Sequence, residues 1–143
     1  MTPLPSPRIS GPFVHLFDPN RARAANRGAH YTNDHCLLRG PDGLWHAIGI
    51  VGARPVDAFD AELTLFHASG PSLEQGGWAE HPPALSADAA RGERFLWAPH
   101  IVLEAGRYAM VYAAGAPARG GESDPEQSDH FGIFLALSPD LTT

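Results

Sequence analysis

The fold is decided by the stretch Phe95-Leu96-Trp97-Ala98-Pro99-His100-Ile101-Val102, which continues after a short turn as Gly106-Arg107-Tyr108-Ala109-Met110-Val111-Tyr112. Both halves are strand-sized and rich in aromatic and β-branched residues, which favour β-structure. The glycine-containing turn between them predicts an antiparallel hairpin, with strands over residues 99–103 and 107–113.

A second copy of this pattern lies upstream in the sequence. Residues 34–39 (Asp-His-Cys-Leu-Leu-Arg, before a glycine turn) match residues 99–104, at an offset of 65 residues. Residues 66–73 match residues 134–141 through a shared Phe-x-Ala-x-x-Pro-x-Leu, at an offset of 68. Three or four antiparallel strands repeated in this way resemble the blades of a β-propeller. Ordinary four-stranded blades have a shorter period of about 40–50 residues, so the longer period here leaves room for functional loops.

The remaining apolar runs are also short, and no long segment has the i, i+3, i+4, i+7 spacing of a helix. They are separated by turn residues, because the chain contains 15 Gly and 14 Pro. The predicted class is therefore all-β, with one short helical turn within residues 86–91 and a surface loop over 116–129. The other expected strands cover residues 35–39, 44–51, 62–69, 79–85 and 131–137.

The repeat changes how the length of 143 residues is interpreted. That length suits one ordinary domain, whereas five blades of this period would need about 325 residues. We expect a partial five-bladed propeller of two blades, about 31–94 and 95–143, preceded by an N-terminal extension over 1–30 with room for an outer strand. The first blade is expected to have four strands, and the second to end short of its fourth. Such a piece would expose apolar inter-blade faces. An unrelated β-sandwich is the alternative.

Charge and cysteine content exclude several classes of function. The net charge is −6 and all ten basic residues are arginines scattered along the chain, so a nucleic-acid partner is not expected. No apolar stretch approaches the roughly 18 residues of a membrane span. Without a signal peptide in the chain as written we expect a cytoplasmic location, and secretion only if a leader precedes it. The single cysteine, Cys36, lies in an apolar run and is expected to be a buried, inert thiol.

The quoted motifs resemble those of five-bladed propeller glycosidases, and most closely glycoside hydrolase family 43, the arabinosidases and xylosidases. Residues 95–102 and 106–112 look like the second-blade signature of these enzymes, and residues 31–35 and 42–49 look like their first blade. The resemblance covers about residues 31–143. It implies hydrolysis of O-glycosyl bonds in pentose-containing or related plant-type polysaccharides and oligosaccharides, with a carbohydrate partner and no cofactor.

In that family three carboxylates act: a first-blade Asp as general base, a third-blade Asp that tunes the acid, and a fourth-blade Glu as general acid. Only the first maps onto this chain, as Asp34. A base must be ionised and hold a water against the anomeric carbon. The alternative is a structural carboxylate before a buried strand. The chain departs from the family pattern by having His35 where proline is frequent.

Four further residues are candidates for contact with the sugar. Asn33, His35 and His100 are expected near the same mouth as partners for hydroxyl groups. Trp97 suits an aromatic wall for a sugar ring, although a Trp that enters a buried strand also serves as packing. No metal site is expected, because the remaining histidines lack the spacing of metal ligands.

The resemblance leaves the function open in one respect. The blades that should carry the acid and the tuning Asp lie outside the match, so we expect this part to be inactive by itself. The alternative is a non-catalytic β-domain that binds glycans or forms oligomers, for which a homo-oligomer would be the natural assembly.

Overall fold

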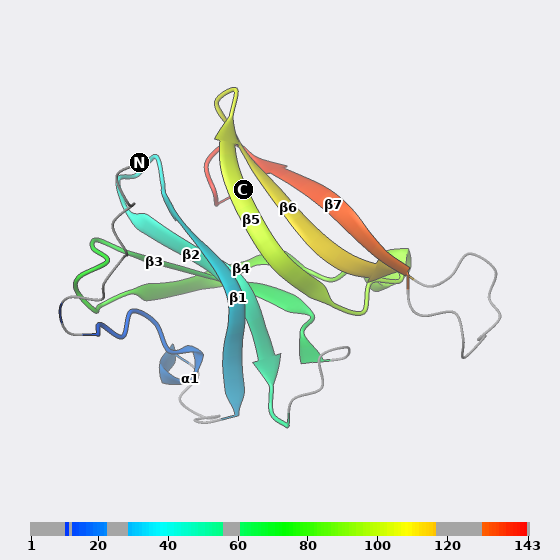
Figure 1. The fold of residues 1–143 in the computed structure, drawn as a ribbon, viewed down its shortest axis with the longest axis horizontal. Helices are drawn as coiled ribbons and strands as arrows, with labels where there is room; N and C mark the ends of the chain where they lie inside the picture. Colours follow the sequence, from blue (N-terminus) through cyan, green and yellow to red (C-terminus); the bar gives the residue numbers. More distant parts are fainter. Residues whose placement is uncertain (1–10, 12, 23–28, 56–60, 117–129, 143) are drawn as a thin grey trace, which may run out of the picture.

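A computed structural model describes residues 11, 13–22, 29–55, 61–116 and 130–142. Within these residues seven strands form two antiparallel sheets, and the structure includes the short helix α1 (Pro19–Ala22) and the 3-10 helix η2 (Ala89–Arg91) (Figure 1). The first sheet has the order β1 (His30–Arg39), β2 (Trp45–Ala53), β3 (Thr64–Gly70), β4 (Ala79–Ser86), and the second has the order β5 (Leu96–Glu104), β6 (Arg107–Ala116), β7 (His130–Ser138).

Turn chemistry explains where the first hairpin of each sheet reverses. The chain between β1 and β2 closes through a hydrogen bond from the Gly40 amide to the Leu44 carbonyl, and Gly43 has a φ of 78° that favours glycine. Between β5 and β6 the two turn residues, Ala105 and Gly106, both have positive φ, at 49° and 79°. Such a two-residue turn matches the twist of the strands that it joins.

The strands and the short helical turn expected from the sequence are confirmed. Each strand overlaps its expected range, and β1 begins five residues earlier, at His30. The helical turn is η2, capped by Asp88, whose carboxylate accepts the Ala90 amide at 2.9 Å. Of the expected surface loop, residues 117–129 lie outside the described residues. Within residues 13–22 the N-terminal extension forms α1 and contains none of the expected outer strand.

The first strand of each sheet carries a β-bulge at the same repeat position. The register shifts between Asn33 and His35 in β1, and between Trp97 and His100 in β5. A bulge inserts an extra residue and bends its strand. The shared bulge confirms the 65-residue offset of the repeat.

The 68-residue offset is wrong by one residue. His35 pairs with Gly49, which lies opposite Phe66, whereas His100 pairs with Val111, which lies opposite Leu135. Phe66 therefore corresponds to Leu135, at an offset of 69. A slip of one residue reverses the face of a side chain, so the two phenylalanines of the sequence match lie on opposite faces of their sheets.

The main core lies between the two sheets. β5 contacts β1, β2 and β3, and large apolar side chains of both sheets meet there, among them Ile48, Ile50, Leu65, Leu96, Ile101, Met110 and Tyr112. A smaller cluster covers the other face of the first sheet, where Phe17 stacks on Phe66 with ring centroids 5.1 Å apart and Trp78 packs beside them. Phe17 of the N-terminal extension therefore covers part of the face of the first sheet that is directed away from the second sheet.

Candidate functional site

The two bulges meet at a surface hollow of about 540 Å³. Its lining consists of residues 32–35 from β1 together with Ala98 and Pro99 from β5. β1 and β5 are neighbours at the junction of the two sheets (Figure 1). The hollow therefore brings together three of the candidate residues, Asn33, Asp34 and His35, all with exposed side chains.

Gly49 allows the β1 bulge to lie close to β2. A Cβ atom added at Gly49 would lie 2.6 Å from the Cβ of His35, 2.7 Å from the Phe66 ring and 2.9 Å from the carbonyl oxygen of Asp34. Glycine within a strand often marks a bulge or a close approach of another backbone. The absence of a side chain at Gly49 therefore leaves room for the backbone of Asp34 in the bulge.

The β5 side of the hollow is shaped by an uncommon backbone conformation. Ala98 has a φ of 48°, a left-handed value that non-glycine residues seldom adopt. The bulge residue after it, Pro99, is buried while it lines the hollow. Conformations of this kind cost about 1–3 kcal/mol and occur often at functional sites.

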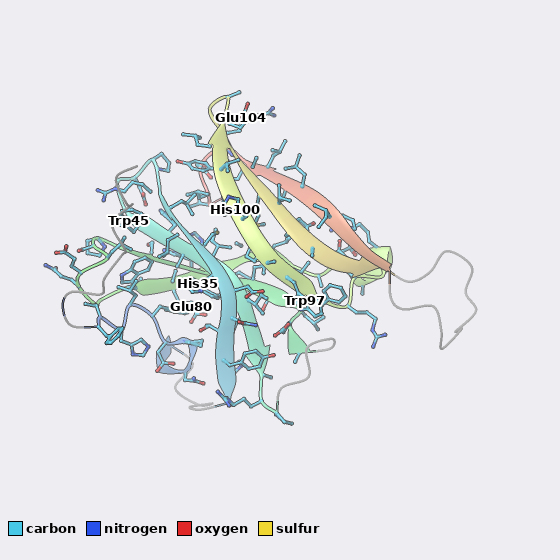
Figure 2. The ribbon with its side chains drawn as sticks, in the orientation of Figure 1. His35, Trp45, Glu80, Trp97, His100 and Glu104 are labelled. Carbon is cyan, nitrogen blue, oxygen red and sulfur yellow. The ribbon has the colours of Figure 1, made fainter. Side chains whose placement is uncertain are left out.

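Trp97 and His100 do not line the hollow. Trp97 is half-buried, packs against the main core and lies 4.1 Å from the Phe95 ring, centroid to centroid. His100 is exposed and pairs with Val111. Figure 2 shows Trp97 at the start of β5 and His100 farther along the strand. Trp97 therefore packs against the core while part of its side chain stays exposed to solvent.

Glu62 links the two strands that flank the hollow. Its carboxylate Oε1 accepts a hydrogen bond from the Tyr31 hydroxyl at 2.8 Å, and its carbonyl accepts the Leu96 amide at 2.9 Å. Glu62 is 4% exposed. It ties the start of β1 to the start of β5, and no local sequence signal indicates this because Tyr31 lies 31 residues away.

Cys36, which the sequence predicts to be buried, is half-buried, and its Sγ donates to the Ile48 carbonyl at 3.6 Å. Burial raises the pKa of the thiol, which disfavours the thiolate that a nucleophile requires. In the described part of the chain, no group of three or more His, Cys, Asp or Glu side chains is arranged to hold a metal ion. No helix there is long and apolar enough to cross a membrane.

A second polar cluster runs through the first sheet, away from the hollow. Asp42 Oδ1 lies 3.1 Å from His46 Nε2, and His46 Nδ1 lies 2.7 Å from His67 Nε2. A carboxylate accepts, so the hydrogen-bond network assigns the His46 proton to Nε2 and makes Nδ1 the acceptor of a proton on His67. His67 in turn packs against His81, whose Nε2 lies 2.7 Å from Ser69 Oγ. Both rings border a largely apolar cavity of about 340 Å³ between the sheets.

This cluster makes stability depend on pH. Burial, with the charges that His81 and His46 would carry, lowers the pKa of His67 from 6.5 to about 4. The unfolded chain then binds this proton more tightly than the folded chain, so the contribution of neutral His67 is present above pH 6.5 and is lost as the pH falls toward 4. We expect a loss of about 2 kcal/mol, after allowance for solvent screening.

Urea unfolding at pH 7.5 and pH 4.5 measures this loss. In His67→Gln, whose amide can still donate to His46 Nδ1, most of the pH dependence should disappear. An equal decrease in the variant would show that other groups cause it.

Comparisons with known proteins agree with this fold. No family model matches the sequence, and no curated protein matches it. Among solved structures, a thermostable family-43 glycoside hydrolase is 18% identical with a TM-score of 0.55, over 81% of this chain and 31% of the other. A GH43 β-xylosidase/α-arabinofuranosidase from a compost microbial metagenome, in complex with xylotriose, is 21% identical with a TM-score of 0.55, over 78% of this chain and 32% of the other. A β-xylosidase is 19% identical with a TM-score of 0.57, over 76% of this chain and 32% of the other.

These likenesses concern the fold. The chain spans about a third of the length of each of these structures. Its two sheets are partial propeller blades with the fold of part of a family-43 glycoside hydrolase, as the resemblance implied. The alternative of an unrelated β-sandwich is therefore wrong.

Proposed function

We propose that this chain, whose fold is that of part of a family-43 glycoside hydrolase, is a fragment of a glycosidase that acts on pentose-containing or related plant-type oligosaccharides and polysaccharides. The observation that carries the proposal is the hollow in which Asp34 lies between the bulges of β1 and β5. The complex of one structural neighbour with xylotriose supports the class of sugar.

In this proposal Asp34 is the general base. A general base accepts a proton from the water that attacks the anomeric carbon, while an acid protonates the leaving oxygen. The Asp34 side chain is exposed at the hollow, so water and a sugar can both reach it. The amide of Asn33 and the imidazole of His35 offer donors and acceptors to sugar hydroxyls. Trp97 and His100 are proposed as contacts for a sugar that extends along β5.

The hollow supplies one of the two carboxyl groups that glycoside hydrolysis requires. Glycoside hydrolysis needs two carboxyl groups about 5–10 Å apart, and Asp34 is the only carboxylate among the described residues that line the hollow. The same observation favours a second candidate, a non-catalytic domain that binds glycans. Both candidates predict sugar binding by this chain, and neither predicts turnover without a partner carboxyl group.

Binding and hydrolysis of xylotriose can be measured on the same sample. We expect saturable binding in a calorimetric titration, and no release of xylose after prolonged incubation. Maltotriose serves as the control sugar and should bind more weakly. Absence of binding to any pentose oligosaccharide would overturn the proposed function. Release of xylose that Asp34→Ala abolishes would show that the chain supplies its own acid.

A further inference from the structure

Glu62 contacts equivalent positions of the two bulged strands. Tyr31 of β1 and Leu96 of β5 are related by the 65-residue offset that also relates the two bulges. Glu62 Oε1 accepts the Tyr31 hydroxyl at 2.8 Å, and the Glu62 carbonyl oxygen accepts the Leu96 amide at 2.9 Å. On each strand the bulge residue that lines the hollow, Asp34 or Pro99, follows shortly after this contact. Glu62 therefore joins the two strands just before the hollow opens between them.

The Tyr31 ring is held between Glu62 and the neighbouring strand. Tyr31 pairs with Gly52 of β2, and a Cβ atom added at Gly52 would collide with the ring Cζ and with the hydroxyl oxygen. The ring therefore occupies the space that a side chain at position 52 would fill. Alternation along β1 places Asn33 on the same face as Tyr31, next along the strand. A shift of the Tyr31 ring would therefore move the backbone that carries Asn33 and Asp34.

The burial of Glu62 suits a residue that fixes a geometry. Glu62 is 4% exposed, and burial of a carboxylate is unfavourable unless it is hydrogen-bonded. An apolar side chain of similar volume would often give equal or greater stability. A hydrogen bond restricts the distance and the direction between its two groups, which apolar packing does not. The pair is therefore better suited to orient the two strands than to stabilise the fold.

We propose that Glu62 and Tyr31 are a positioning pair for the sugar site. They fix the separation of the two bulges, and so the space available to a sugar between Asp34 and Ala98; the choice of ligand rests on the proposed function. Neither residue of the pair lines the hollow, so both act through the backbone of the bulges. Residues that bind a ligand must be held within about 0.5 Å of the productive geometry by such supporting contacts.

Calorimetric titration with xylotriose tests the pair through small changes of side chain. Tyr31→Phe removes only the hydroxyl, and Glu62→Leu replaces the carboxylate with an apolar side chain of similar size. We expect each to raise the Kd about 10-fold. The double variant should raise it no further, because the two residues act as one unit. Glu62→Gln keeps a carbonyl oxygen that accepts from the Tyr31 hydroxyl, and should restore binding to within about 3-fold of the wild type.

Tyr108→Phe is the matched control for Tyr31→Phe. Tyr108 is 7% exposed and pairs with Leu103, near the opposite end of β5 from Leu96. Loss of its hydroxyl should leave the Kd unchanged. Amide shifts of the sugar-free ¹⁵N-labelled chain give a second readout. The Ala98 amide, which lies on the other strand from Tyr31, should shift in Tyr31→Phe and not in Tyr108→Phe.

The positioning role and the proposed function fail in different ways. A wild type that does not bind xylotriose overturns the proposed function, and the sugar-free Ala98 shift then decides whether the pair positions the bulges. If the wild type binds and Tyr31→Phe binds equally well with the Ala98 amide unmoved, the positioning role is wrong and the proposed function stands. Glu62→Gln that binds as weakly as Glu62→Leu would also overturn the role. Should Glu62→Leu fail to fold, Tyr31→Phe carries the test by itself.

Discussion

Replacing Gly49 with valine is expected to lower the free energy of unfolding by about 3 kcal/mol, the upper end for overpacking at a well-packed site. A Cβ atom there would meet the Cβ of His35, the Phe66 ring and the carbonyl oxygen of Asp34, all within 3 Å. Because Asp34 contributes a backbone atom, a change of side-chain rotamer cannot relieve the contact. The β1 bulge must move, and the hollow must change shape with it.

Urea unfolding measures the stability of Gly49→Val, and Ala79→Val is its control. Ala79 lies exposed at the start of β4, so the same side chain there should change stability by less than about 0.5 kcal/mol. If Gly49→Val is as stable as the wild type, the bulge of β1 does not depend on a glycine at position 49 of the neighbouring strand.

Replacing Asp34 with alanine is expected to weaken xylotriose binding about 10-fold to 100-fold, with the fold unchanged. A hydrogen bond to a charged group contributes about 1.5–3 kcal/mol, and each 1.4 kcal/mol is about a factor of ten in Kd. Asp34 is exposed in a bulge, so its removal leaves no cavity in the core. Calorimetric titration of both proteins gives the ratio of the two Kd values.

Glu104→Ala controls for the lost negative charge. Glu104 is exposed, and Figure 2 shows it at the tip of the β5–β6 hairpin, away from His35. Its removal should leave the Kd unchanged. If Asp34→Ala and Glu104→Ala weaken binding equally, the effect comes from net charge and the role proposed for Asp34 is wrong.

The sequence predicts the strands because their signal is local. Short apolar runs alternate with Gly and Pro turns, and the recurrence of residues 34–39 at 99–104 identifies the repeated unit before any contact is known. The resemblance then adds what periodicity cannot: the propeller form and the choice of Asp34. The match of Phe66 with Phe134 is misleading, because the two residues are identical but differ by one position in strand register, and the register decides which face of the sheet a side chain occupies.

The parts of the site that the sequence does not predict depend on long-range contacts. The Tyr31–Glu62 hydrogen bond joins residues 31 positions apart, and no local pattern distinguishes a buried, bonded Glu from a solvated one. Trp97 illustrates the same limit, because the packing and sugar-wall interpretations use the same residue in the same motif. Its contacts with Phe95 and the core become known only when the sheets are assembled.

The most direct test of the central claim, that the hollow between the two bulges binds the sugar, is to map xylotriose on the ¹⁵N-labelled chain by NMR. The account predicts that the largest amide shifts fall on residues 32–35 and Ala98, and that Asp34→Ala removes them. Shifts concentrated on the cavity of about 340 Å³ beside His67 and His81 would contradict it.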